Sequence, residues 1–212
     1  MTDVLDQSPA QPLPRTLAPL DDEARALLFT GARTANSFAA TPVTDAELSE
    51  IWDLAKWAPT AANFQPLRVL YVTSPDARER LAAHMTERNR AKTLAAPAVA
   101  VLAFDSRFHE HIPTVAPFRA EVMPAFEENE EMRLDASRFN SAMQAGYFVL
   151  AVRAAGLAAG PMGGFDAPAV DAEFFPDGRF HSILVVNIGH PTTDSYRDRG
   201  ARLPNEHVVH WA

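Results

Sequence analysis

Three short segments of this chain combine residue types that suit binding of an anionic, aromatic small molecule. The first places a guanidinium, a hydroxyl and an amide within four residues, at Arg33, Thr34 and Asn36. A guanidinium binds phosphate through two parallel hydrogen bonds, and an amide matches carbonyl and imide groups. Taken alone, this segment is more simply explained as a plain turn between two helices.

The second segment reads Pro-Thr-Ala-Ala-Asn-Phe-Gln-Pro at residues 59–66. Its two prolines stiffen the loop, so that Asn63 could be held at a fixed distance from a ring at small entropic cost. The alternative is a rigid connection between a helix and a strand in which Asn63 caps its own backbone.

The third segment reads Gly-Pro-Met-Gly-Gly-Phe at residues 160–165. Glycine lets the backbone come close to the face of an aromatic ring. The same residues also read as a glycine-rich turn that ends a core helix, and the two interpretations are compatible.

In this order the segments resemble the FMN-dependent nitroreductase family, in which three separated segments close on one flavin. The resemblance runs from about Arg33 to the C-terminus and is greatest to the subgroup that contains the malonic semialdehyde reductase of uracil degradation. It implies an α+β fold with a central mixed β-sheet flanked by helices, and an intertwined homodimer with FMN at the interface.

The resemblance also assigns roles to individual residues. The backbone N–H of Gly163 is expected to face flavin N5 as the catalytic donor, Lys92 to lie near N1 and O2, and Arg202 to bind the phosphate. Arg199 is an uncertain substitute for a basic residue that relatives carry before Arg202. The implied FMN contacts are Arg33, Thr34, Asn36, Pro59, Thr60, Ala61, Asn63, Lys92, Pro161, Met162, Gly163, Gly164 and Arg202.

This sequence departs from the family pattern at its first segment. Ala32 and Asn36 stand at two positions that are commonly basic in relatives, which weakens phosphate capture there. Without the resemblance, Lys92 would be taken as solvated surface.

Composition excludes several other kinds of chemistry. The chain has 212 residues and no cysteine, so disulfides, iron–sulfur clusters and thiol nucleophiles are absent. A net charge of −8 argues against nucleic-acid binding. No apolar run is long enough for a membrane span and the start lacks the pattern of a signal peptide, so a cytoplasmic protein is expected. The cluster His109-Glu110-His111 is read as a solvated polar patch rather than a metal site.

The elements needed to position these segments follow from capping signals and hydrophobic patterning. Residues 1–19 are expected to form a flexible arm, and residues 20–212 a single FMN-binding domain in which 105–135 form a lid. The apolar tail from His190 to Ala212 is expected to pack against a protein surface that the sequence does not identify. Helices are expected at 21–30, 44–57, 75–90, 137–156 and 166–174, and strands at 68–73, 98–104 and 182–188.

The sequence therefore predicts an NAD(P)H oxidoreductase that transfers hydride through flavin N5. Its expected acceptor is small, such as a 3-oxo acid or semialdehyde, a nitroaromatic compound, a quinone or an enone, and NADH or NADPH would be the donor. The alternatives are a flavin-storage protein without turnover and a metal-dependent hydrolase built on His109 and His111.

Overall fold

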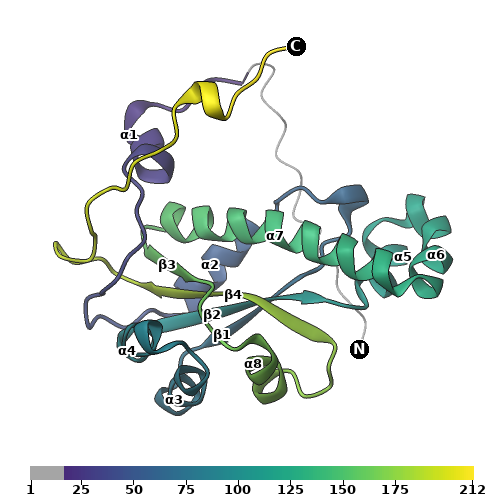
Figure 1. Ribbon diagram of the computed structural model, residues 1–212, viewed down its shortest axis with the longest axis horizontal. Helices are drawn as coiled ribbons and strands as arrows, with labels where there is room; N and C mark the ends of the chain where they lie inside the picture. The colour runs from purple at the N-terminus through teal and green to yellow at the C-terminus, as the bar shows by residue number, and fades with distance from the viewer. Residues whose placement is uncertain (1–16) are drawn as a thin grey trace.

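The computed structural model describes residues 17–212, which form three layers with a β-sheet in the middle (Figure 1). Most of the predicted N-terminal arm lies outside the described residues. The strand order is β1-β2-β4-β3. The strands are β1 Leu67–Val72, β2 Ala98–Asp105, β3 Ala158–Met162 and β4 Phe180–Gly189.

All three strand pairings are antiparallel, so the α+β prediction is confirmed but the mixed sheet is wrong for the described strands. The reason lies in the connections. Val72, at the end of β1, pairs with Val99 near the start of β2. The connection between the two strands therefore enters β2 beside the point where it leaves β1. A connection of that kind makes neighbouring strands run in opposite directions.

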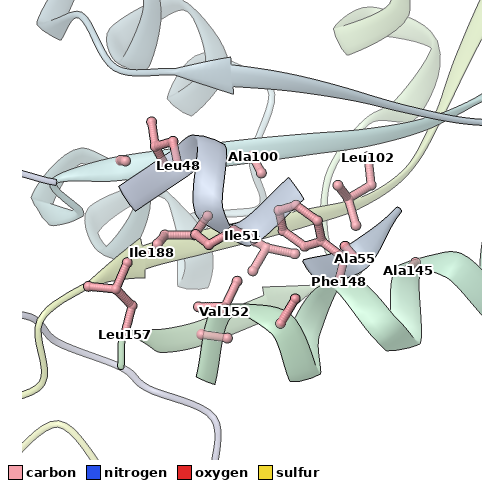
Figure 2. Close-up of a cluster of buried hydrophobic side chains, with 14 of the residues drawn as sticks. Leu48, Ile51, Ala55, Ala100, Leu102, Ala145, Phe148, Val152, Leu157 and Ile188 are labelled. Carbon is pink, nitrogen blue, oxygen red and sulfur yellow. The ribbon is translucent and has the colours of Figure 1, made fainter. Parts of the chain in front are cut away.

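Both faces of the sheet are covered by helices, and every residue of β2 is buried. α2 (Asp45–Ala55) and α7 (Glu130–Ala154) pack on one face, where Figure 2 shows Ile51 and Phe148 meeting strand residues. The other face is covered by α3 (Pro75–Ala83), α4 (Glu87–Ala95) and α8 (Ala167–Phe174) (Figure 1).

The remaining elements are short. Asp22–Arg25 (α1) continues into a π-helical turn at Ala26–Thr30 (η1) where one helix was predicted, and η2 lies at Ala61–Asn63. Residues 105–135, predicted to form a lid and called the lid region below, contain η3 Phe108–His111, α5 Ile112–Val115, η4 Pro117–Val122 and α6 Met123–Glu128. In the tail, η5 lies at Asn205–His207.

α7 is longer than the predicted helix because it begins at Glu130 rather than 137. Asn129 caps it by accepting a hydrogen bond from the Met132 N–H, and Glu130 and Glu131 lie at the positive end of its dipole. The first turns of this helix therefore lie inside residues 105–135, the stretch that was expected to form a lid. No helix in residues 17–212 is both long and apolar enough to cross a membrane.

The predicted helix at 75–90 is two helices, α3 and α4, because a tertiary contact interrupts it. Met85 forms an isolated β-bridge with Phe165, and the Thr86 N–H donates to the Gly164 carbonyl. Lys92 consequently lies in the last turn of α4 rather than in a loop.

The Gly160-Pro161 segment belongs to β3 and is not the turn that ends the core helix. That turn is made earlier, at Gly156, whose φ is +79°. Proline is tolerated in β3 because the strand lies at the sheet edge, where a missing N–H breaks no ladder hydrogen bond.

The lid region packs a small apolar cluster of its own around Phe64, Phe108, Ile112 and Phe126. It lies at the N-terminal end of α7 (Figure 1). The region begins at Asp105, the last residue of β2.

Asp105 is a fully buried carboxylate shared by two arginines. Arg68 Nη2 lies 2.7 Å from one oxygen, and Arg179 donates from Nε at 2.9 Å and from Nη2 at 3.0 Å. Burial alone would raise the pKa of Asp105, but the hydrogen bonds from Arg179 and from the Arg107 N–H, with the charge of Arg68, hold it below its ordinary value.

Replacing Asp105 with asparagine should lower the free energy of unfolding by roughly 3 kcal/mol, because it leaves two arginines without their shared charge. A depressed carboxyl pKa contributes stability above its unfolded pKa and loses it as pH falls through the folded value. The gap between wild type and Asp105→Asn, measured by urea unfolding at fixed protein concentration, should therefore shrink below about pH 4.

Asp53→Asn is the control, since Asp53 is exposed and pairs with Lys56 on the surface of α2. It should change stability by less than about 1 kcal/mol. Equal effects of the two substitutions would show that the shared carboxylate does not anchor this end of the sheet.

Candidate functional site

The open edge of β3 presents backbone groups to the segment that contains Arg33. The Ala35 N–H donates to the Ala159 carbonyl at 2.9 Å, so the polar groups of Ala159 point away from β4. Backbone groups alternate sides along a strand, which directs those of Pro161 and of Gly163, directly after β3, to the same open side. Gly163 is exposed, and its N–H has no acceptor among the described residues.

Glycine has different uses along this edge. A Cβ at Gly160 would lie 2.7 Å from the Ala35 carbonyl oxygen, so glycine permits the close approach of the two segments. A Cβ at Gly163 would meet nothing within 4 Å, and its φ lies outside the left-handed region. Gly163 thus leaves open space without being needed for the backbone conformation.

Lys92 connects α4 to the Arg33 segment. Its Nζ donates to Asn36 Oδ1 at 2.8 Å, while Asn36 donates from Nδ2 to the Thr34 carbonyl. Burial lowers the pKa of Lys92, and the positive charges of Arg197 and Arg88 lower it further. A nearby anion would offset those effects and stabilise the charged amine.

Four arginines gather around a hollow of about 240 Å³ beside this lysine. Arg33 donates to the Arg197 carbonyl at 3.2 Å, Arg199 to the Ala32 carbonyl at 3.0 Å, and Arg202 to the Gly200 carbonyl at 2.9 Å. The hollow is lined by Ala32, Arg33, Thr34, Asn36, Arg197, Asp198, Arg199, Gly200 and Arg202.

None of these four arginines, nor Lys92, forms an ion pair with a carboxylate within the part of the chain described here. Elsewhere the pattern differs, since Arg68 and Arg179 share Asp105. Asp198 is the one carboxylate among the lining residues, so the cations outnumber it and make a local positive field in a chain of net charge −8. Guanidinium groups also match phosphate oxygens. The hollow is therefore suited to a phosphate or a similar anion.

The structure does not bring the 59–66 loop to this hollow. The Ala61 N–H donates to Asn140 Oδ1 at 2.7 Å near the middle of α7, whereas Arg153, in the last turn of α7, donates to the Arg33 carbonyl at 3.4 Å. A rise of 1.5 Å per residue puts roughly 20 Å of helix between Asn140 and Arg153. Within one chain, Pro59, Thr60, Ala61 and Asn63 thus lie far from the other predicted contacts.

The loop itself holds an unusual backbone conformation. Ala62, Asn63 and Gln65 have φ values of +46°, +61° and +47°, a region that residues other than glycine adopt rarely. Asn63 donates to the Val115 carbonyl of the lid at 2.7 Å and accepts from Gln65 at 2.9 Å, so it does not cap its own backbone. Strained backbone of this kind clusters at functional sites.

The prediction that His109-Glu110-His111 is a solvated polar patch holds for Glu110 and His111, which are exposed, but is wrong for His109. His109 is 1% exposed, and its Nε2 lies 2.6 Å from Glu127 Oε2. His111 Nε2 instead lies 3.3 Å from Arg179 Nη2. The described residues contain no group of three or more potential ligands arranged for a metal.

Sequence reasoning missed three residues at this edge. Arg197 was recognisable as part of the arginine-rich run Arg-Asp-Arg-Gly-Ala-Arg at 197–202. Thr86 and Asn89 both contact the Gly164 carbonyl, and no sequence signal joins residues so far apart.

A family model described as "Nitroreductase family" matches residues 30–190. The chain belongs to the nitroreductase family. A Streptomyces coelicolor protein named as an NADH dehydrogenase/NAD(P)H nitroreductase is 58% identical over 201 residues, 95% of this chain and 98% of the relative. A Leptothrix cholodnii protein of the same description is 48% identical over 87% of this chain and 93% of the relative.

Solved structures share the nitroreductase fold at lower identity. An Exiguobacterium sibiricum nitroreductase in complex with FMN has a TM-score of 0.78 at 20% identity, over 93% of this chain and 100% of that one. A Staphylococcus epidermidis NAD(P)H:FMN oxidoreductase has a TM-score of 0.79 at 21% identity, over 92% of this chain and 98% of that one.

The two adjacent glycines of this nitroreductase should respond differently to alanine. A Cβ at Gly164 would lie 2.8 Å from Asn89 Nδ2 and 3.0 Å from Thr86 Oγ1, so Gly164→Ala should displace both donors and cost about 1–2 kcal/mol of stability. Gly163→Ala should leave stability unchanged or raise it by up to about 1 kcal/mol. Urea unfolding of the flavin-free proteins measures both, and a greater loss at Gly163 would contradict the geometry of this edge.

Proposed function

We propose that this protein is an FMN-dependent NAD(P)H oxidoreductase. The observation that carries the proposal is that a hollow lined by unpaired cations and an exposed, unpartnered Gly163 N–H lie along one strand edge. This combination fits a mononucleotide, which has one phosphate and one flat polar ring. The names of the relatives and the FMN complex of a structural neighbour support the same reading.

Each group at the β3 edge then has a role. Arg33 and Arg202, with Arg197 beside them, would hold the phosphate. Lys92, oriented by Asn36, would stabilise negative charge on the pyrimidine edge of the ring. The Gly163 N–H would offer a hydrogen bond where hydride arrives.

When bound, FMN would supply the hydride-transfer chemistry between NADH or NADPH and an acceptor. The proton that a carbonyl acceptor also takes up would come from water, so the chain need not provide an acid or a base. Its contribution is to orient the ring and to stabilise charge.

The acceptor is proposed to be a small carbonyl compound of the 3-oxo acid or semialdehyde class, as in a malonic semialdehyde reductase. Nitroaromatics, quinones and enones are further candidates. Residues 105–135 are proposed to form the acceptor lid, in which Phe118 is 70% exposed at a kinked turn. This region contacts the 59–66 loop directly, since Asn63 donates to the Val115 carbonyl.

A homodimer would complete the site by placing the loop and lid of one chain over the β3 edge of the other. Phe139, Met143 and Tyr147 form an exposed apolar stripe at four-residue spacing on α7. In the tail, Val208 and Trp211 are exposed, the latter by 93%. Exposed apolar groups of this extent mark an interaction surface, and a second copy would cover both.

The purified protein should therefore be yellow, release FMN on denaturation and bleach on anaerobic addition of NADH or NADPH. Flavin that stays oxidised with both donors would favour a storage protein, and a colourless protein that gains no flavin on reconstitution would end the proposal.

Arg202→Ala should weaken FMN binding by about 1.5–3 kcal/mol, the range for a hydrogen bond to a charged group. Titration of flavin-free protein by fluorescence quenching measures the dissociation constant. Arg80→Ala is the matched control, because Arg80 already pairs with Asp76 and Glu173. Equal affinity of Arg202→Ala and Arg80→Ala would place the phosphate elsewhere.

A further inference from the structure

α4 carries three polar residues on one stripe that faces the proposed flavin site. Thr86, Asn89 and Lys92 are spaced three residues apart, which keeps them on one side of a helix. Lys92 reaches the Asn36 side chain, as described above. Thr86 and Asn89 instead reach the loop after β3.

The Gly164 carbonyl accepts three hydrogen bonds from these two residues. The donors are the Thr86 N–H at 3.1 Å, the Thr86 hydroxyl at 3.0 Å and the Asn89 amide at 3.0 Å. A carbonyl oxygen has two lone pairs, so this acceptor is fully used. The contact is unusually dense for an exposed loop.

The Thr86 hydroxyl makes this contact and does not cap its own helix. It is the N-cap residue of α4, a position where the side-chain oxygen normally accepts a hydrogen bond from the first turn. Thr44 and Ser74 cap α2 and α3 in that way. Thr86 forms no such bond, and its hydroxyl donates to Gly164 instead.

The contact restrains a pair of glycines that would otherwise have wide backbone freedom. Around Gly164, the Phe165 N–H donates to the Gly163 carbonyl at 3.3 Å and Phe165 bridges to Met85. The Gly163 and Gly164 carbonyls are thus both bonded, and on the other side Met162 pairs with Val185 in the sheet. The exposed Gly163 N–H therefore lies between two restrained segments.

We propose that Thr86 and Asn89 are positioning residues that aim the Gly163 N–H and, through α4, set its place relative to Lys92. The consequence for the flavin rests on the proposed function, whereas the restraint on the turn does not. One rigid helix would thereby hold the donor expected at N5 and the cation expected at the pyrimidine edge in a fixed relation.

Thr86→Val tests the proposal, because it removes the hydroxyl while keeping the shape of the side chain. Hydrogen exchange of the flavin-free protein, read by mass spectrometry over residues 160–166, should speed up about fivefold, the equivalent of one hydrogen bond. Thr86→Ser should restore the wild-type exchange. Asn89→Ala should give the same increase by an independent change.

Thr93→Val is the matched control. Thr93 is buried in the same helix and its hydroxyl bonds to the Asn89 carbonyl, not to Gly164. It should leave exchange over 160–166 unchanged. Faster exchange throughout α3 and α4 in Thr86→Val would instead reveal general loosening and contradict a specific restraint.

In the flavin-loaded protein, Thr86→Val should slow anaerobic reduction by NAD(P)H by about fivefold and change FMN affinity by less than about twofold. Unchanged exchange in Thr86→Val and Asn89→Ala would overturn the proposal. Changed exchange with unchanged reduction would overturn its functional part. Failure of the wild type to bind FMN would count against the proposed function, while the exchange result would still decide whether the turn is restrained.

Discussion

The length and rigidity of α7 are the constraint on which the site depends. This helix is bonded near its middle to the 59–66 loop and at its last turn to the Arg33 segment, so it holds the two about 20 Å apart. A packed α-helix of 25 residues has a fixed length. Within one chain the two segments are therefore held apart, and a loop supplied by a second copy of the chain is the arrangement that we propose for one shared flavin.

The β3 edge shows how a largely acidic protein can prepare a site for an anion. The sheet leaves one side of β3 open, and the segment containing Ala35 covers only part of it. Beyond that contact, the chain provides cations without carboxylate partners and one outward N–H. These cations and this N–H raise the free energy of the free protein, and a bound anion would lower it again. Such features therefore indicate a ligand site and do not stabilise the fold by themselves.

Local signals predicted the elements whose ends are set by neighbouring residues. The capping box at Thr44 and Glu47 and the cap at Asp166 begin helices where expected, and the apolar run after Pro97 is a buried strand. The incorrect predictions concern elements whose structure depends on residues that are distant in the sequence. Gly160 and Pro161 disfavour a strand by themselves, yet β4 pairs with them. The break after α3 depends on a contact with Gly164, which is far along the chain. Capping rules use only neighbouring residues and therefore could not predict it.

The structure brings Arg33, Asn36, Lys92 and Arg202 close together, as the family-like motifs predicted, and their contact with a flavin stays a prediction. The resemblance also placed the flavin at a dimer interface, which is compatible with the separation of Asn63 from this group within one chain. No local signal in the sequence gives the length of α7 that sets this separation.

The most direct test of a shared site is to mix two variants, Asn63→Ala and Arg202→Ala, that each impair a different half of the proposed site. In a mixed dimer, one of the two sites would combine an intact loop from one chain with an intact hollow from the other. The account predicts that co-expression of the two variants restores flavin content and NAD(P)H-dependent reduction to a substantial fraction of the wild type. Mixed dimers no better than either variant alone would show that each site is built within a single chain.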